Sequence, residues 1–326
     1  MSKYDLTLLI LVLALVLNAC TTEKANNNDS PITETAYFGE KPPGLTPKLF
    51  DPKIVSPEGF FESGTFSPDM KEFYFTRKNG KYKERTFFVI RNENNKWSQP
   101  SETDIRWPLF SADGNTIYIR KQYRERTETG WSEPKNLGEF IKEQAHGLSV
   151  SDNGTFYFPF FKEEDNGRGN LGYSRLINGQ YESPVKMSTE INTGEYIAHP
   201  FIAPDESYLM WDVEREDGYG ESDIYISYRN KDGSWSKSIN MGSAINTEHL
   251  ESSPRVTHDG KYLFFTRGEW EIKEDGSRNY VGKSYWVDAQ IIDNLRPEKQ
   301  TTSTKVPPQL QPTGSKQKSQ CFHTGS

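Results

Sequence analysis

A short polar turn followed by an aromatic, alternating run recurs along this chain. Five copies are present, FSPDMKEFYF (66–75), FSADGNTIYI (110–119), VSDNGTFYF (150–158), IAPDESYLMW (202–211) and VTHDGKYLFF (256–265). Their turn residues are separated by 44, 40, 52 and 54 residues. Because periods of this size are typical of repeat architectures, the recurrence constrains the fold more than any other feature of the sequence.

Each copy belongs to a longer unit with two further β-type runs. An aromatic residue leads a W-S-x-P-like run at Trp97, Trp131, Tyr181 and Trp235, and another run precedes it, as in TFFVI (86–90). Asp, Asn and Gly at the turn close a tight hairpin, because they tolerate positive φ and Asx side chains hydrogen-bond the local backbone. Each unit is therefore predicted to be a four-stranded antiparallel meander.

One such unit cannot bury both faces of its sheet, so the units have to stack on one another. Radial stacking into a propeller is the common arrangement at this period. The sequence therefore predicts an all-β fold, a β-propeller of four-stranded antiparallel blades over residues 45–297. Five blades are expected, because the alternative of six would need another unit within 268–297. The segment LFDPKIVS (49–56) is expected to close the ring by pairing with the last blade.

The units resemble the WD40-like propeller repeat of TolB-type periplasmic proteins and of many bacterial lipoproteins. The matching residues are SPD (67–69), APD (203–205) and GESDIYISYRNKDGSWS (220–236), and the resemblance covers residues 45–297. It implies the fold and leaves the function open, because propellers of this kind host binding, scaffolding and catalysis.

The N-terminal segment MSKYDLTLLILVLALVLNAC is typical of an export signal. Its apolar run of about twelve residues is shorter than the roughly twenty that span a bilayer. LNAC (17–20) resembles the lipobox of bacterial lipoproteins, which implies a signal peptide over 1–19 and a membrane-anchoring, palmitate-type lipid on Cys20. An ordinary cleaved signal or an uncleaved anchor is the alternative. Either way the expected location is the cell envelope, as an outer-membrane or cell-surface protein if lipidated.

Composition narrows the organisation and the partners further. Polar segments at 20–44 and 298–326 are expected to be a disordered tether and tail. The net charge is −7 with both signs interspersed, which argues against nucleic acid as a partner. The two cysteines, Cys20 and Cys321, lie near opposite ends, so no disulfide is expected.

Candidate site residues follow from the repeat, because the strand before each Asp turn lines the channel in propellers of this kind. Alternation lets only one of two adjacent residues face the channel, although a bulge can bring in either. Positions seven and six residues before the turn are Glu62/Ser63, Arg106/Trp107, His146/Gly147, Ala198/His199 and Ser252/Ser253.

Five of these residues suggest a pocket for a polar or anionic ligand. Trp107 offers a stacking surface for a sugar ring. The remaining candidates are Glu62, Arg106, His146 and His199. The alternative is that these residues only satisfy one another, with Arg106 paired to Glu62, and bind nothing.

Catalytic and metal-binding interpretations use an overlapping set of residues. Glu62 and Glu251 would have to flank one bond to act as a glycosidase pair. His146 and His199 are loosely similar to the channel histidines of oligogalacturonate-type polysaccharide lyases, which also use a metal. A divalent metal on these histidines is the weaker alternative to having no cofactor.

Three functions remain open. The preferred one is a lipid-anchored envelope module that binds a glycan, peptidoglycan or protein partner. The second is an extracellular polysaccharide-active enzyme, a lyase or glycosidase with its site at the channel mouth. The third is a purely structural envelope subunit.

Overall fold

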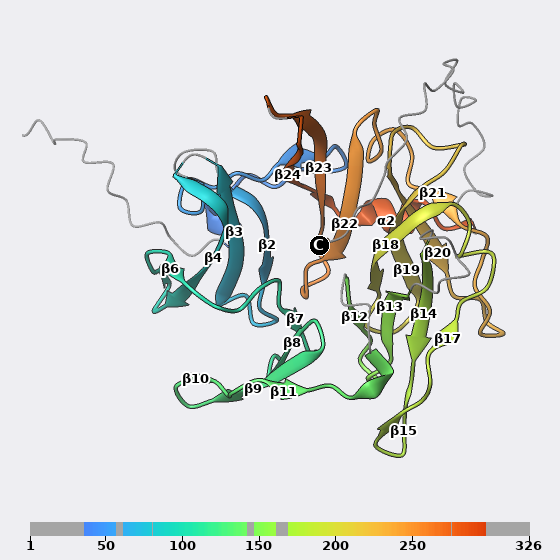
Figure 1. The fold of residues 1–326 in the computed structure, drawn as a ribbon, viewed down its shortest axis with the longest axis horizontal. Coiled ribbons are helices and arrows are strands. Elements are labelled where there is room, and N and C mark those ends of the chain that lie inside the picture. The colour runs from blue at the N-terminus through green and yellow to red at the C-terminus, as the bar shows by residue number, and fades with distance from the viewer. Residues whose placement is uncertain are drawn as a thin grey trace, which may run out of the picture.

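The computed structural model describes residues 36–56, 61–79, 81–141, 147–160, 169–274 and 276–297 (Figure 1). Its strands form five antiparallel sheets of four or five strands, arranged around a common centre as the blades of a propeller. The predicted all-β, five-bladed fold is confirmed. The expected signal peptide, Cys20, residues 20–35 of the expected tether and the C-terminal tail lie outside the described residues. The rest of the expected tether, residues 36–44, is part of the fold, because Tyr37 and Phe38 are buried in the aromatic core of blades 1 and 5.

In blades 1 to 4 the innermost strand comes first in the chain, and blade 5 differs only in its outer strand, which comes from the N-terminal segment. Blade 1 contains β2 (Phe61–Phe66), β3 (Glu72–Asn79), β4 (Tyr82–Glu93), β5 (Lys96–Trp97) and β6 (Ser101–Glu102). Blade 2 contains β7 (Leu109–Phe110), β8 (Thr116–Ile119), β9 (Gln122–Thr127), β10 (Gly130–Trp131) and β11 (Lys135–Asn136). Blade 3 contains β12 (Ser149–Val150), β13 (Phe156–Phe160), β14 (Asn170–Ser174) and β17 (Val185–Lys186). A small ribbon of β15 (Leu176–Ile177) and β16 (Gln180–Tyr181) adjoins it in the chain.

The last two blades follow the same plan. Blade 4 contains β18 (Glu195–Ile202), β19 (Tyr208–Glu214), β20 (Asp223–Tyr228) and β21 (Ile239–Asn240). Blade 5 contains β22 (Leu250–Val256), β23 (Tyr262–Ile272), β24 (Arg278–Asp288) and β1 (Lys48–Leu49). The helical elements are short: η1 (Ala36–Gly39), η2 (Glu139–Ile141) and α2 (Gln290–Asn294).

The ring is closed by the N-terminal strand, as the segment 49–56 suggested. Strand β1 is the outer strand of blade 5, with Lys48 opposite Trp286 and Leu49 opposite Tyr285. The next residue, Phe50, is fully buried among aromatic side chains of blades 1 and 5, with ring centroids 4.9 Å from Phe264 and 5.1 Å from Trp286. The two ends of the propeller sequence therefore share one core.

The repeated turn residue stabilises its hairpin through its side chain. In blade 2, Asp113 Oδ1 accepts hydrogen bonds from the Ser111 hydroxyl (2.6 Å) and the Asn115 amide (2.9 Å). In blade 1, Asp69 accepts the equivalent bonds from Ser67 and Lys71. The hydrogen bond from Ser111 is the main reason that the pKa of Asp113 is lowered. The recurring Asp is thus a structural residue of the hairpin.

The Ser that follows the aromatic residue in the W-S-x-P-like run has an equally local role. Ser98 Oγ accepts the amide of Arg91 (3.0 Å), and the Ser98 amide donates to the Arg91 carbonyl (2.8 Å). Ser132 and Ser236 repeat this reciprocal pair in blades 2 and 4. The motif therefore attaches the outer turn to the third strand of the blade.

We predict that Phe50→Ala lowers the free energy of unfolding by about 3–5 kcal/mol, because it leaves a cavity in the core shared by the first and last blades. Leu49→Ala is the matched control. Leu49 is 42% exposed, so its truncation is expected to change stability by less than about 0.5 kcal/mol. Urea unfolding of both variants measures the difference. Equal losses would contradict the assignment of Phe50 as the closing residue.

Candidate functional site

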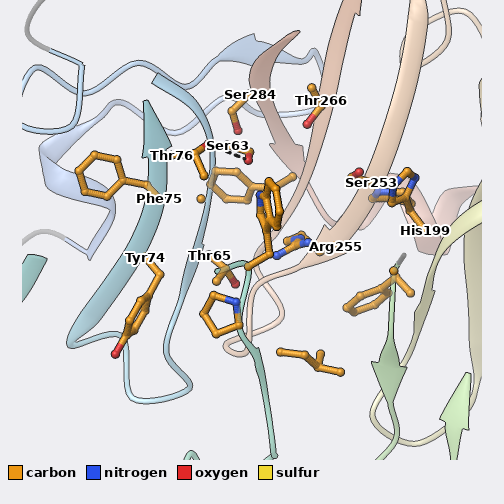
Figure 2. Close-up of a pocket in the computed structure, with 18 of the residues that line it drawn as sticks. Ser63, Thr65, Tyr74, Phe75, Thr76, His199, Ser253, Arg255, Thr266 and Ser284 are labelled. Carbon is orange, nitrogen blue, oxygen red and sulfur yellow. Dashed lines mark hydrogen bonds between the residues drawn. The ribbon is translucent and has the colours of Figure 1, made fainter. Parts of the chain in front are cut away.

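The inner strands surround a cavity of about 440 Å³ at the centre of the propeller (Figure 2). Every blade contributes to its lining. The position six residues before each Asp turn is represented by Ser63, Trp107, Gly147, His199 and Ser253. Of the two candidate positions in each repeat, this is the one that faces the cavity in all five blades.

Backbone with positive φ recurs at this position in four of the blades, and in blades 4 and 5 it coincides with a register shift of the inner strand. Trp107, Gly147, His199 and Ser253 all have positive φ, at 46°, 82°, 42° and 56°. The pairing register of β18 shifts between Ala198 and Phe201. A positive φ at a non-glycine residue costs on the order of 1–3 kcal/mol and persists only where the surrounding structure holds it. The same strained position therefore recurs around the cavity wall.

Glu62 lines the cavity but is already paired. Arg85 donates two hydrogen bonds to its carboxylate, from Nε and Nη2, both at 2.6 Å. Thr76 adds a third at 3.3 Å. The pairing of Glu62 with Arg106 that the sequence suggested is wrong, because the third strand of the same blade carries a guanidinium within bidentate reach. Glu62 is therefore poorly suited to act as a free catalytic carboxylate.

Arg106 and Trp107 form an aromatic and cationic corner of the cavity. The guanidinium of Arg106 lies 5.4 Å from the centre of the Phe87 ring, and Trp107 packs edge-on against the same ring at 4.8 Å. Trp107 is 43% exposed, and the Arg85 guanidinium lies 5.8 Å from its ring centre. An exposed indole beside cations is well suited to stacking against a polar, anionic ring.

His199 is held by a buried carboxylate. Its Nδ1 lies 3.0 Å and 3.1 Å from the two oxygens of Asp212, which also accepts the Ser253 amide at 2.9 Å. Burial lowers the pKa of His199, but the Asp212 carboxylate outweighs it and the net shift is upward. With Nδ1 engaged, Nε2 is the ring nitrogen left for a ligand. The other histidine predicted from the sequence, His146, lies outside the described residues.

Glu251 does not belong to the described cavity lining, contrary to its proposed role beside Glu62. Its carboxylate is fully buried and accepts hydrogen bonds from Arg267 Nε (2.7 Å) and from the Thr247 hydroxyl (2.6 Å) and amide (2.8 Å). Burial is the main reason that the pKa of Glu251 is raised. The pair Glu62 and Glu251 therefore does not flank one open space, and a two-carboxylate glycosidase site is not formed.

Arg255 is the cavity residue that the sequence reasoning missed. It lies on β22, two residues after Ser253, and its side chain points into the centre of the cavity (Figure 2). Within the described part of the chain, the Arg255 guanidinium has no hydrogen bond and no carboxylate partner. Burial lowers its pKa, but arginine stays protonated at neutral pH. Reading the repeat four residues before the turn, a second inward position, would have found it.

The described cavity lining carries an excess of positive charge. It holds four arginines (Arg85, Arg106, Arg120 and Arg255) against one carboxylate, Glu62, and so a surplus of three positive charges with its histidines neutral. The whole chain has a net charge of −7. A concave, low-dielectric wall of one sign concentrates ions of the opposite sign, so the cavity is suited to an anion.

The described residues contain no group of three or more His, Cys, Asp or Glu side chains placed to hold a metal ion. They also contain no helix with the length and apolar character needed to cross a bilayer.

Comparison of the sequence with protein-family models and with curated proteins gave no match. Among solved structures, the chain is similar to a functionally unknown protein from Desulfotomaculum acetoxidans DSM 771 (11% identity, 69% of this chain, 70% of that chain, TM-score 0.37). It is also similar to XC5397 from Xanthomonas campestris, a gluconolactonase (12% identity, 72% of this chain, 73% of that chain, TM-score 0.41). A third similar structure is a GH43_12 retrieved from capybara gut metagenome (15% identity, 76% of this chain, 58% of that chain, TM-score 0.41).

The chain spans less than two thirds of several chains that it matches, including 23% of the tricorn protease chain. These likenesses are too distant to carry an argument about the function of this protein.

We predict that Glu251→Ala destabilises the protein by about 3–5 kcal/mol, because it leaves the Arg267 guanidinium buried without its carboxylate. Glu102→Ala, at an exposed position on β6, is the control and is expected to change stability by less than about 0.5 kcal/mol. Chemical denaturation gives both values. A fully stable Glu251→Ala variant would contradict the structural role of this carboxylate.

Proposed function

We propose that the protein is a lipid-anchored envelope propeller that binds acidic sugars in its central cavity. The observation that carries this proposal is Arg255, an inward-pointing guanidinium with no carboxylate partner among the described residues. A planar guanidinium matches a carboxylate or a sulfate through two parallel hydrogen bonds. A ligand anion would therefore supply the partner that the described residues do not provide.

The remaining cavity wall supports a sugar as the carrier of that anion. Trp107 offers an exposed aromatic face, and Ser63, Thr65 and Ser253 place hydroxyl-bearing side chains around Arg255 (Figure 2). Sugar rings present an apolar face and a rim of hydroxyls, so they use both features. An envelope glycan or peptidoglycan fragment fits this combination better than a neutral peptide does.

The cellular setting of the proposal rests on the sequence. The apolar run and LNAC (17–20) support export and lipidation at Cys20, and the polar residues between Cys20 and the core residue Tyr37 would place the propeller at a distance from the membrane. The resemblance to TolB-type repeats supports the same location.

We predict that Arg255→Gln weakens binding of galacturonic acid roughly 10- to 100-fold, because it removes a charge-assisted pair of hydrogen bonds. Arg255→Lys keeps the charge without the bidentate geometry and should fall between Arg255→Gln and the unaltered protein. Isothermal titration with galacturonic acid and with neutral galactose measures the effect.

The control for this experiment is Arg175→Gln, which removes an arginine of blade 3 that pairs with Glu182 outside the cavity. It should bind as the unaltered protein does. Binding of galactose and galacturonic acid with equal affinity, or an unchanged affinity in Arg255→Gln, would overturn the anion site.

A second candidate function is supported by the Asp212-held imidazole of His199 beside Arg255. On an acidic polysaccharide, Arg255 would neutralise the sugar carboxylate while neutral His199 removes the proton from the adjacent carbon. The C–H electron pair then forms the C=C bond, the glycosidic C–O bond breaks, and the leaving oxygen takes a proton from water. This is a β-elimination that uses general-base catalysis.

The raised pKa of His199 makes the two functions respond to pH in opposite directions. Protonated His199 adds a positive charge, so anion affinity should fall as the pH rises through this pKa, above the ordinary value of about 6.5. The elimination rate should rise over the same range, because only the neutral imidazole accepts a proton. His199→Gln should abolish both dependences.

Titrations with galacturonic acid trimer, and ultraviolet detection of the unsaturated product, measure these two quantities. If binding follows this pH dependence and no product forms, the proposed enzymatic function is overturned and the proposed binding function remains. Product formed at an unchanged rate by His199→Gln would overturn the assignment of His199 as the base.

A further inference from the structure

The hairpin of blade 5 extends one wall of the cavity outward. Strands β23 and β24 are 11 residues long each, compared with 7 and 6 for β19 and β20 in blade 4. Directly opposed residues in an antiparallel pair share a face, and every second pair returns to that face. One face of the hairpin carries, in order toward the tip, the pairs Thr266/Ser284, Gly268/Gly282 and Trp270/Tyr280.

This face is continuous with the cavity. Thr266, Ser284 and Tyr280 all line it, so the next aromatic residue, Trp270, stands just beyond its edge on the same surface. The Trp270 and Tyr280 rings are 5.4 Å apart, and Trp270 is 41% exposed. An exposed tryptophan here adds little to the core, because the strands extend past the body of the blade.

The two glycines make room for the Tyr280 ring. A Cβ at Gly282 would lie 2.6 Å from Tyr280 Cε1, and one at Gly268 would lie 2.9 Å from Tyr280 Cζ. No side chain larger than hydrogen fits between this ring and the hairpin backbone. The tyrosine therefore covers the glycine pair and bridges the polar wall at Thr266 to the indole of Trp270.

The guanidinium of Arg278 borders this surface, and Lys78 fastens the hairpin to blade 1. The Arg278 guanidinium lies 4.9 Å from the centre of the Trp270 ring, and Lys78 Nζ donates to the Asn279 side chain at 2.7 Å, which ties the hairpin tip to β3. Alternation puts Glu269 and Glu271 on the opposite face of the hairpin. Tyr280 itself stays uncharged, because burial raises its pKa.

We propose that Trp270, Tyr280 and Arg278 form a second sugar subsite, which binds the next residue of an acidic chain whose end occupies the cavity. This inference rests on the proposed function, since the cavity holds the first residue. The Trp270 ring stacks on the second sugar, and Arg278 meets its acidic group. The preferred ligand is then an acidic oligosaccharide, and a single acidic sugar binds more weakly.

The test compares galacturonic acid with its linear trimer by isothermal titration. The unaltered protein should bind the trimer more tightly, and Trp270→Ala should weaken the trimer roughly tenfold while leaving the monomer unchanged. Trp270→Phe should recover most of the loss, because it keeps an aromatic face. Arg278→Gln should also weaken only the trimer.

Ile177→Ala is the matched control, since Ile177 is a 47% exposed hydrophobic residue on the hairpin ribbon of blade 3, outside the cavity. It should bind both sugars normally. Equal affinity of the unaltered protein for monomer and trimer, or equal losses for both in Trp270→Ala, would overturn the second subsite and leave the cavity site standing. Failure of the unaltered protein to bind either sugar would overturn both the cavity site and the second subsite. Arg255→Gln distinguishes the two sites, because it should weaken binding of the monomer and of the trimer alike.

Discussion

The structure depends on the inability of any one blade to bury both faces of its sheet. Each blade must pack against its neighbours, and the ring is complete only when β1 joins blade 5. The aromatic core around Phe50 shows the consequence most directly, since it unites rings from the first and last blades. Once the ring is closed, the inner strands have to face one another across a central cavity. The candidate site is thus a by-product of the same packing constraint that stabilises the fold.

Charged residues from different blades lie together in the cavity lining, because the inner strands of all the blades face it. Arg85 comes from β4 and Arg255 from β22, while the only carboxylate described in the lining, Glu62, is bound bidentately by Arg85. Arg255 has no carboxylate partner among the described residues, which is unfavourable for a cation in a partly desolvated position. A bound anion would remove that cost, which is why the binding interpretation accounts for this side chain better than a purely structural one does. His199 beside it adds a titratable group whose pKa is raised by the Asp212 carboxylate, which outweighs the effect of burial.

Much of the fold could be predicted from the sequence, because the turn residue, the alternation and the W-S-x-P-like run act through local hydrogen bonds. Asp113 and Ser98 illustrate this, since each bonds atoms within about one turn or one hairpin of itself. The inward position of His199 was also anticipated, as one of two alternatives in its repeat. The partner of Glu62 was not anticipated, because Arg85 and Arg106 are both close enough to Glu62 in sequence to pair with it. Only the geometry of the strands selects Arg85. Arg255 was not predicted, because the sequence analysis considered only the adjacent positions seven and six residues before each turn, and Arg255 lies four residues before it.

The number of blades, the order of strands within each and the closure by the N-terminal segment follow from the amino-acid sequence alone. These properties depend on short-range turn chemistry and on a hydrophobic period that can be counted. Which side chains face the cavity, and which charges meet there, depends on the folded ring. Positive φ at Trp107, and bulges with positive φ at His199 and Ser253, turn these residues toward the cavity, and L side chains adopt this backbone only where the surrounding structure holds it. Charge pairing depends on distance in space, so Glu62 binds Arg85 of its own blade, and the closed ring brings Arg85 and Arg255, which are far apart in the chain, into one cavity lining.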